Sequence, residues 1–130
     1  MMINDPETLA EMRLAFARYE QALVTNDLAV LDELFWQDER TIRYGGAENL
    51  YGIAEILEFR RNRPASGLER DLSRTVITTF GRDFATASTL FHRAALPGRT
   101  GRQMQSWVRM QRGWRIVAAH VSMIEETGQH

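Results

Sequence analysis

The chain contains no cysteine and no lysine. Without cysteine it can form no disulfide, no thiolate nucleophile and no zinc site with cysteine ligands. Without lysine, a Schiff base or an amine nucleophile could arise only at the N-terminus. The sequence also lacks an apolar run long enough for a signal peptide or a membrane span, so we expect a cytoplasmic protein with no membrane partner.

Charge of neither sign predominates. Sixteen basic residues, all arginine, stand against seventeen acidic residues, and the net charge is -1. Such a balance produces no broad positive field to attract a nucleic acid, so none is expected as a partner. The 130 residues, 44% of them hydrophobic, fit one globular domain over residues 1–130.

Three helices are expected in the first half of the chain. Asp5 and Pro6 are typical of a helix start, and apolar residues then recur every three or four positions, which predicts a helix over about 6–25. Asn26 and Asp27 precede a second, shorter helix with apolar residues on one side. A third helical pattern follows Gly52 and should end before Pro64.

Three arginines lie at the end of the third helix: Arg60, Arg61 and Arg63. Positive charge is favourable at a helix C-terminus because the backbone dipole is negative there. We therefore predict a solvated, charged face rather than a patch that binds nucleic acid.

Strands are expected in the second half, where the hydrophobic period changes to two. The predicted strands cover residues 72–80, 84–95, 103–111 and 114–122, and a short strand precedes them at Thr41-Ile-Arg-Tyr44. Helices followed by strands predict an α+β domain, with the helices covering one face of a curved antiparallel sheet.

A predicted two-residue turn at Arg112-Gly113 sets the pairing of the last two strands. Counting back from the turn places Gln105 opposite His120 and Trp107 opposite Ala118 on one mixed face. The other face is apolar and carries Met104, Val108, Met110, Val117, Val121 and Met123. We predict a homodimer through the apolar face, which would be the outer face, and a pocket lined by the mixed face.

Several segments together resemble a known family. These are Arg18-Tyr-Glu-Gln-Ala-Leu23, Leu34-Phe-Trp36, Thr41-Ile-Arg-Tyr-Gly45, Glu48-Asn-Leu-Tyr-Gly52, Gly101-Arg-Gln-Met-Gln-Ser-Trp107 and Gly113-Trp-Arg-Ile-Val-Ala-Ala-His-Val-Ser122. In order and spacing they are similar to the AtzH-like branch of the SnoaL-like, nuclear transport factor 2-like superfamily, and within it to the HpxZ-type proteins of oxalurate catabolism. The resemblance implies a cone-shaped α+β half-barrel with a deep pocket.

The resemblance also implies an activity and two site residues. One type in the AtzH-like branch removes a carboxyl group from a carboxylated urea during cyanuric acid breakdown, without metal or organic cofactor. Its functional tyrosine and arginine correspond here to Tyr19 and Arg43. By this resemblance the two residues are the catalytic pair, no cofactor is expected, and the ligand is a small anionic carboxylate.

Arg43 needs an anionic partner wherever it lies inside the fold, because a guanidinium that loses hydration costs several kcal/mol unless acceptors meet it. One possibility is an ion pair with Glu20, Glu48 or another acid of the chain, or an exposed position on a strand edge. The other is a ligand carboxylate, which a guanidinium can bind with two parallel hydrogen bonds.

Tyr19 lies on the apolar stripe of the first helix, so its phenol should point inward. A core tyrosine with its hydroxyl bonded to backbone is one interpretation. In the other, a nearby Arg43 stabilises the phenolate and lets Tyr19 exchange a proton. We hypothesise that Arg43 orients an N-carboxylate and that Tyr19 protonates the nitrogen from which carbon dioxide departs.

Three further residues are candidate substrate contacts. Gln105 and His120 could hydrogen-bond the N–H and C=O groups of a urea, although His120 could equally be a core histidine. Trp107 could form a pocket wall or belong to the core. No spacing of histidines and acids in the sequence is typical of a metal site, and none is predicted.

Two functions follow from these observations. The first is a small cofactor-free enzyme, a decarboxylase or hydrolase acting on a carboxylated urea or an oxalurate-type anion in ureide or triazine nitrogen catabolism. The second is a non-catalytic pocket protein that binds a ureide acid or assists a partner amidohydrolase. Both require an anion beside Arg43.

Overall fold

The structure is a computed structural model that describes residues 1–126. In chain order the elements are α1 (Pro6–Val24), α2 (Leu28–Leu34), β1 (Ile42–Tyr44), β2 (Asn49–Tyr51), α3 (Ile53–Asn62), β3 (Asp71–Phe80), β4 (Phe84–His92), β5 (Arg99–Met110) and β6 (Gly113–Glu125). The three predicted helices and the predicted α+β class are confirmed.

Side-chain caps begin the first two helices where the sequence predicts them. The Asp5 carboxylate accepts a hydrogen bond from the backbone N–H of Thr8 at 3.1 Å, and Pro6 occupies the first turn of α1. The Asp27 carboxylate accepts one from the backbone N–H of Val30 at 3.2 Å and begins α2. These bonds satisfy backbone donors that have no partner within a helix.

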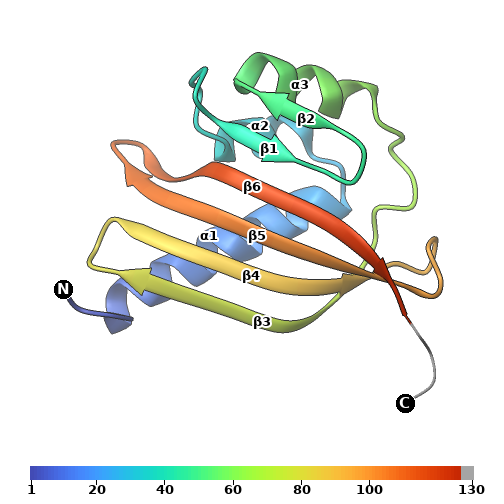
Figure 1. Ribbon diagram of the computed structural model, residues 1–130. Coiled ribbons are helices and arrows are strands. Elements are labelled where there is room, and N and C mark those ends of the chain that lie inside the picture. The colour runs from blue at the N-terminus through green and yellow to red at the C-terminus, as the bar shows by residue number, and fades with distance from the viewer. Residues whose placement is uncertain (127–130) are drawn as a thin grey trace.

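The six strands form one curved, open sheet in the order β2-β1-β6-β5-β4-β3, and α1 lies across one of its faces (Figure 1). The last four strands form the predicted antiparallel meander. Two features differ from the prediction: β1 pairs with β6 in parallel, and β2 is an additional strand that pairs with β1. The sheet and the helices enclose a core that includes Met12, Leu31 and Trp107, each fully buried.

The predicted register of the last two strands is wrong. The turn lies at Gln111-Arg112, one residue earlier than predicted, and Met110 pairs with Gly113. A bulge then leaves Val117 as an extra residue on β6, so that Gln105 pairs with Ala119 rather than with His120. The segment after α2 pairs with β6 just before this bulge, through a hydrogen bond from the Trp36 N–H to the Ile116 carbonyl at 3.0 Å.

Because the bulge shifts the side-chain alternation by one residue, β6 exchanges its faces there. Ala119 and Val121 pair with Gln105 and Gln103 on the inner side, while His120 pairs with Met104 on the outer side and is exposed. The predicted apolar face is therefore divided between both sides of the sheet. A homodimer through the outer face stays a prediction, with Val76, 58% exposed, and Met104, 52% exposed, among its apolar residues.

Candidate anion-binding site

Tyr19 lies on the inward side of α1, as predicted, and is only 6% exposed. Its ring packs edge-on against Trp107, with the ring centroids 6.4 Å apart, and also contacts Phe35 at the same centroid distance. Trp107 in turn donates a hydrogen bond from Nε1 to Oε1 of Gln105 at 3.0 Å. Trp107 and Gln105 are thus buried on the inner face, and Trp107 supports the Tyr19 ring directly.

Arg43 extends from β1 and has a partner within the chain. Its Nη1 donates to Oε2 of Glu48 at 2.9 Å, its side chain is 14% exposed, and its guanidinium lies over the Phe59 ring. Gly45 makes this pairing possible, because a Cβ at that position would overlap the Glu48 carboxylate. The ion pair that the sequence allows as an alternative is therefore present. It uses one of five N–H donors of the guanidinium.

Two further arginines interact electrostatically with Tyr19: Arg63, which follows α3, and Arg93, which follows β4. Burial lowers the pKa of Arg63 to about 10; Tyr19 opposes this shift, and the positive charges of Arg60, Arg43 and Arg93 add to it. Burial also lowers the pKa of Arg93, Arg70 adds to the shift, and Tyr19 opposes it. Charge effects therefore link Arg63 to Arg60, Arg43 and Arg93, and link Arg93 to Arg70 and Arg43, with the Tyr19 phenol acting on both.

Neither Arg63 nor Arg93 has a carboxylate partner among residues 1–126. The buried Nε and Nη2 of Arg63 and the buried Nε of Arg93 also donate to no acceptor in this part of the chain. Sequence reasoning predicts a solvated face for the arginines at the end of α3; this prediction is wrong for the buried Arg60, while Arg61 is exposed and Arg63 is half-buried. Arg60 is 5% exposed and donates to Oδ1 of Asp32 at 2.7 Å.

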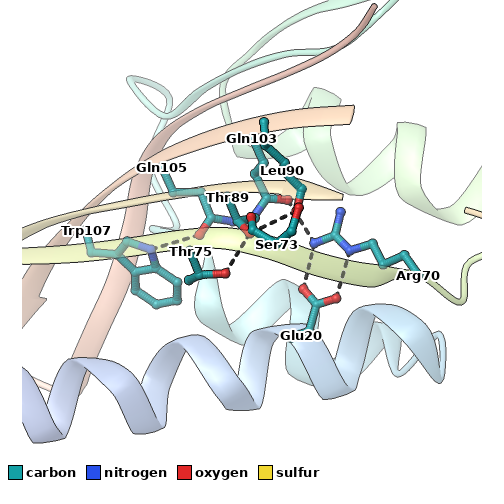
Figure 2. Close-up of polar contacts among 9 residues, drawn as sticks. All are labelled: Glu20, Arg70, Ser73, Thr75, Thr89, Leu90, Gln103, Gln105 and Trp107. Carbon is teal, nitrogen blue, oxygen red and sulfur yellow. Dashed lines mark hydrogen bonds and ion pairs between the residues drawn. The ribbon is translucent and has the colours of Figure 1, made fainter. Parts of the chain in front are cut away.

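Arg70 contrasts with Arg63 and Arg93 because it forms an ion pair with a carboxylate. It donates from Nε and Nη2 to the two carboxylate oxygens of Glu20 on α1, at 2.8 and 2.6 Å (Figure 2). Its Nη2 also donates to Oε1 of Gln103 on β5 at 3.0 Å. This bond fixes the amide of Gln103, whose buried Nε2 has no partner among the described residues.

Phe91 supports two of the arginines. The guanidinium carbons of Arg70 and Arg93 lie 4.5 and 5.3 Å from the centroid of its ring, within the range of cation–π attraction. Gly101 is the cross-strand partner of Phe91, and a Cβ at Gly101 would overlap the ring. The glycine therefore leaves the space that the ring occupies.

The structure brings together Tyr19, Trp107 and Gln105 of the predicted site residues, with Arg43 nearby, but not His120. The exposed His120 packs edge-on against Tyr44, at a centroid distance of 6.0 Å. Sequence reasoning missed Arg63 and Arg93. The register of the β3–β4 hairpin, which pairs Asp71 with His92, places the flanking Arg70 and Arg93 at the same end of the sheet.

Comparison with known proteins identifies the family of this chain. The model of the AtzH-like family matches residues 1–127. The chain belongs to the AtzH-like family. No curated protein matches it. Among the residues that the structure describes, no helix of this AtzH-like protein is long and apolar enough to cross a membrane, and no cluster of three acidic or histidine side chains could hold a metal ion.

Solved structures similar to this AtzH-like protein include two with substantial sequence identity. A protein of unknown function from Pectobacterium atrosepticum SCRI1043 is 59% identical, with 95% of each chain covered and a TM-score of 0.92. A protein with a cystatin-like fold from Burkholderia xenovorans LB400 is 47% identical, covering 96% of this chain and 98% of its own, also at 0.92.

A more distant structure shows the wider fold class. A protein of unknown function from Shewanella oneidensis MR-1, described as NTF-2 like, is 19% identical, covering 88% of this chain and 98% of its own, with a TM-score of 0.72. The AtzH-like chain therefore has the nuclear transport factor 2-like fold, as the sequence resemblance implies.

Proposed function

We propose that this AtzH-like protein is a small cofactor-free enzyme of ureide or triazine nitrogen catabolism. Its substrate is a carboxylated urea or an oxalurate-type anion, which it decarboxylates or hydrolyses beside Tyr19 and Arg43. Membership of the family and the nuclear transport factor 2-like fold support the binding of a small molecule. The observation that supports an anionic substrate is that Arg63 and Arg93, on whose pKa values Tyr19 acts, have buried N–H groups without an acceptor in the described part of the chain.

For a carboxylated urea, the reaction needs an anion-binding group and one proton donor. The C–N bond to the carboxylate breaks, carbon dioxide leaves, and the electron pair stays on the nitrogen. Tyr19 donates its phenolic proton to that nitrogen and later regains a proton from water. Arg43 and its arginine neighbours hold the anion in place and stabilise the phenolate that forms. Trp107, packed against the Tyr19 ring, keeps the phenol in a fixed orientation.

The second candidate is a non-catalytic protein that binds a ureide acid, or that assists a partner amidohydrolase. One observation favours it: Glu48 already neutralises Arg43, so this arginine has less positive charge to offer a reacting carboxylate. In this case the same cluster would bind the acid without turning it over.

Two substitutions test the catalytic assignment. Tyr19→Phe removes the proton donor and Arg43→Lys removes the planar guanidinium, and each should lower turnover by about tenfold or more. The assay measures carbon dioxide and ammonia released by the purified protein from dicarboxyurea and from oxalurate. Tyr51→Phe and Arg40→Lys are matched controls because both side chains are largely exposed.

Turnover near the wild-type rate in either test variant would contradict the assignment. A ligand of the native state raises thermal stability by mass action. If the wild-type protein releases neither product but is thermally stabilised by one of these acids, the result supports the non-catalytic binding function and contradicts the enzymatic one.

A further inference from the structure

Arg63 and Arg93 present buried hydrogen-bond donors to which residues 1–126 offer no acceptor. A buried donor without a partner costs about 1–3 kcal/mol, and more when the group is charged. Proteins normally avoid this arrangement by pairing the charge or exposing it to water. Two such arginines in one neighbourhood therefore require an explanation.

Neighbouring arginines that have an acid partner do not share this property. Arg70 is 1% exposed, but Glu20 meets it with both carboxylate oxygens. Arg43 is paired with Glu48. Among these arginines, those without an acid partner in residues 1–126 are thus Arg63 and Arg93, which come from different parts of the chain, and the charge of Arg93 contributes to the lowered pKa of Arg63.

The chemistry of the unpartnered atoms indicates what would satisfy them. All of them are N–H groups. They are Nε and Nη2 of Arg63, Nε of Arg93 and Nε2 of Gln103. Gln103 cannot turn its oxygen toward the cluster without losing the bond from Arg70. A molecule that meets these groups must supply oxygen acceptors, and two guanidinium charges without acids favour negative charge on it.

We propose that Arg63 and Arg93 bind an anionic group of the ligand at a position separate from Arg43, with Gln103 as a neutral donor beside them. The proposal rests on the proposed function in placing the reacting carboxylate at Arg43 and Tyr19. It adds that the ligand carries a second anionic group, which Arg63 and Arg93 recognise. These two arginines then set the preference of the site for dianions over monoanions of the same size.

Binding of oxalate and oxamate tests this proposal. The two probes have nearly the same size, but oxamate replaces one carboxylate of oxalate with a neutral amide. Calorimetric titration at constant ionic strength should show that the wild-type protein binds oxalate about tenfold or more tightly than oxamate. In Arg63→Gln and in Arg93→Gln, oxalate affinity should fall by about tenfold or more, and the preference over oxamate should shrink accordingly.

Arg61→Gln is the matched control, because Arg61 is exposed on the same helix end and should leave oxalate affinity unchanged. Circular dichroism establishes that each variant is folded. Arg63→Lys and Arg93→Lys serve where a glutamine variant does not fold, since they keep the charge but lose the planar donors, and oxalate should again bind more weakly. The proposal is overturned if the wild-type protein binds neither probe, if it binds both equally, or if the Arg63 and Arg93 variants keep wild-type affinity for oxalate.

The same variants separate this proposal from the enzymatic one. The wild-type protein could bind oxalate through Arg63 and Arg93 and yet turn over neither dicarboxyurea nor oxalurate. This outcome supports the second anion position and contradicts the proposed catalytic function. Turnover with unchanged kcat/KM in Arg63→Gln and Arg93→Gln supports catalysis and overturns the second anion position.

Discussion

Arg70 and Arg63 are the same residue type in neighbouring parts of one fold, yet their surroundings differ. Arg70 forms a two-bond pair with Glu20 and a third bond with Gln103, whereas the buried donors of Arg63 have no partner among residues 1–126. Arg60 resembles Arg70 because Asp32 meets it. The burial of an arginine therefore does not by itself determine whether an acid of the chain is paired with it. The carboxylates of Glu20 and Asp32 tie Arg70 and Arg60 into the fold, whereas the buried donors of Arg63 have no acceptor in the described part of the chain.

Removing the carboxylate from the paired arginine should have the largest effect. Glu20→Gln leaves the Arg70 charge buried without compensation, and loss of one partner of a buried ion pair costs about 3–5 kcal/mol. We expect the free energy of unfolding, measured by urea denaturation, to fall by about 3 kcal/mol because Glu20 keeps some contact with water.

The exposed pair between Arg18 and Glu33 provides the control for this measurement. Both side chains are 47% exposed, so Glu33→Gln should cost less than about 1 kcal/mol. Equal losses in the two variants would show that burial of Arg70 does not matter to its pairing.

Removing an unpaired arginine should have a smaller effect of opposite sign. Arg63→Met replaces buried donors that lack partners with an apolar side chain of similar length, so the ligand-free protein should gain about 1 kcal/mol in free energy of unfolding. Urea denaturation measures this change in the free energy of unfolding. Arg70→Met, which leaves Glu20 without its ion-pair partner, should lower the free energy of unfolding. A loss in both variants would mean that Arg63 contributes to the fold as Arg70 does.

The smallest expected effect is the pH dependence of that gain. The pKa of Arg63 is lowered to about 10 in the folded protein, from an ordinary value of 12.5. Above about pH 10 the unfolded chain therefore binds a proton that the folded protein does not, and the contribution of Arg63 to stability rises with pH. The advantage of Arg63→Met should shrink between about pH 9 and pH 11, as measured by urea denaturation at both values. A constant advantage would contradict the lowered pKa.

Local signals predicted most of the fold. The caps at Asp5 and Asp27 and the change of hydrophobic period near Arg70 are encoded by neighbouring residues, and the elements appear close to the predicted bounds. The bulge at Val117 was not predictable in this way. It lies where the segment after α2 joins β6, a contact between residues far apart in the sequence. One unforeseen residue moved His120 to the outer face.

The site was predictable to a similar extent. Tyr19 follows from the spacing of its helix, and the pairing of Arg43 with Glu48 is among the alternatives that the sequence offers. Arg63 was missed because a charged helix end is usually solvated, and nothing in its local sequence shows that the fold buries part of its side chain. The position of Arg93 depends on the register of the β3–β4 hairpin, which composition does not reveal.

Gly101 has a consequence for how this site could change. The residue contacts no proposed ligand group, yet its missing side chain makes room for the Phe91 ring on which two guanidinium groups rest. A single added methyl group would displace that ring and, with it, the spacing between cationic groups. Evolution or a protein engineer could in this way retune which acids the chain accepts without substituting a charged residue.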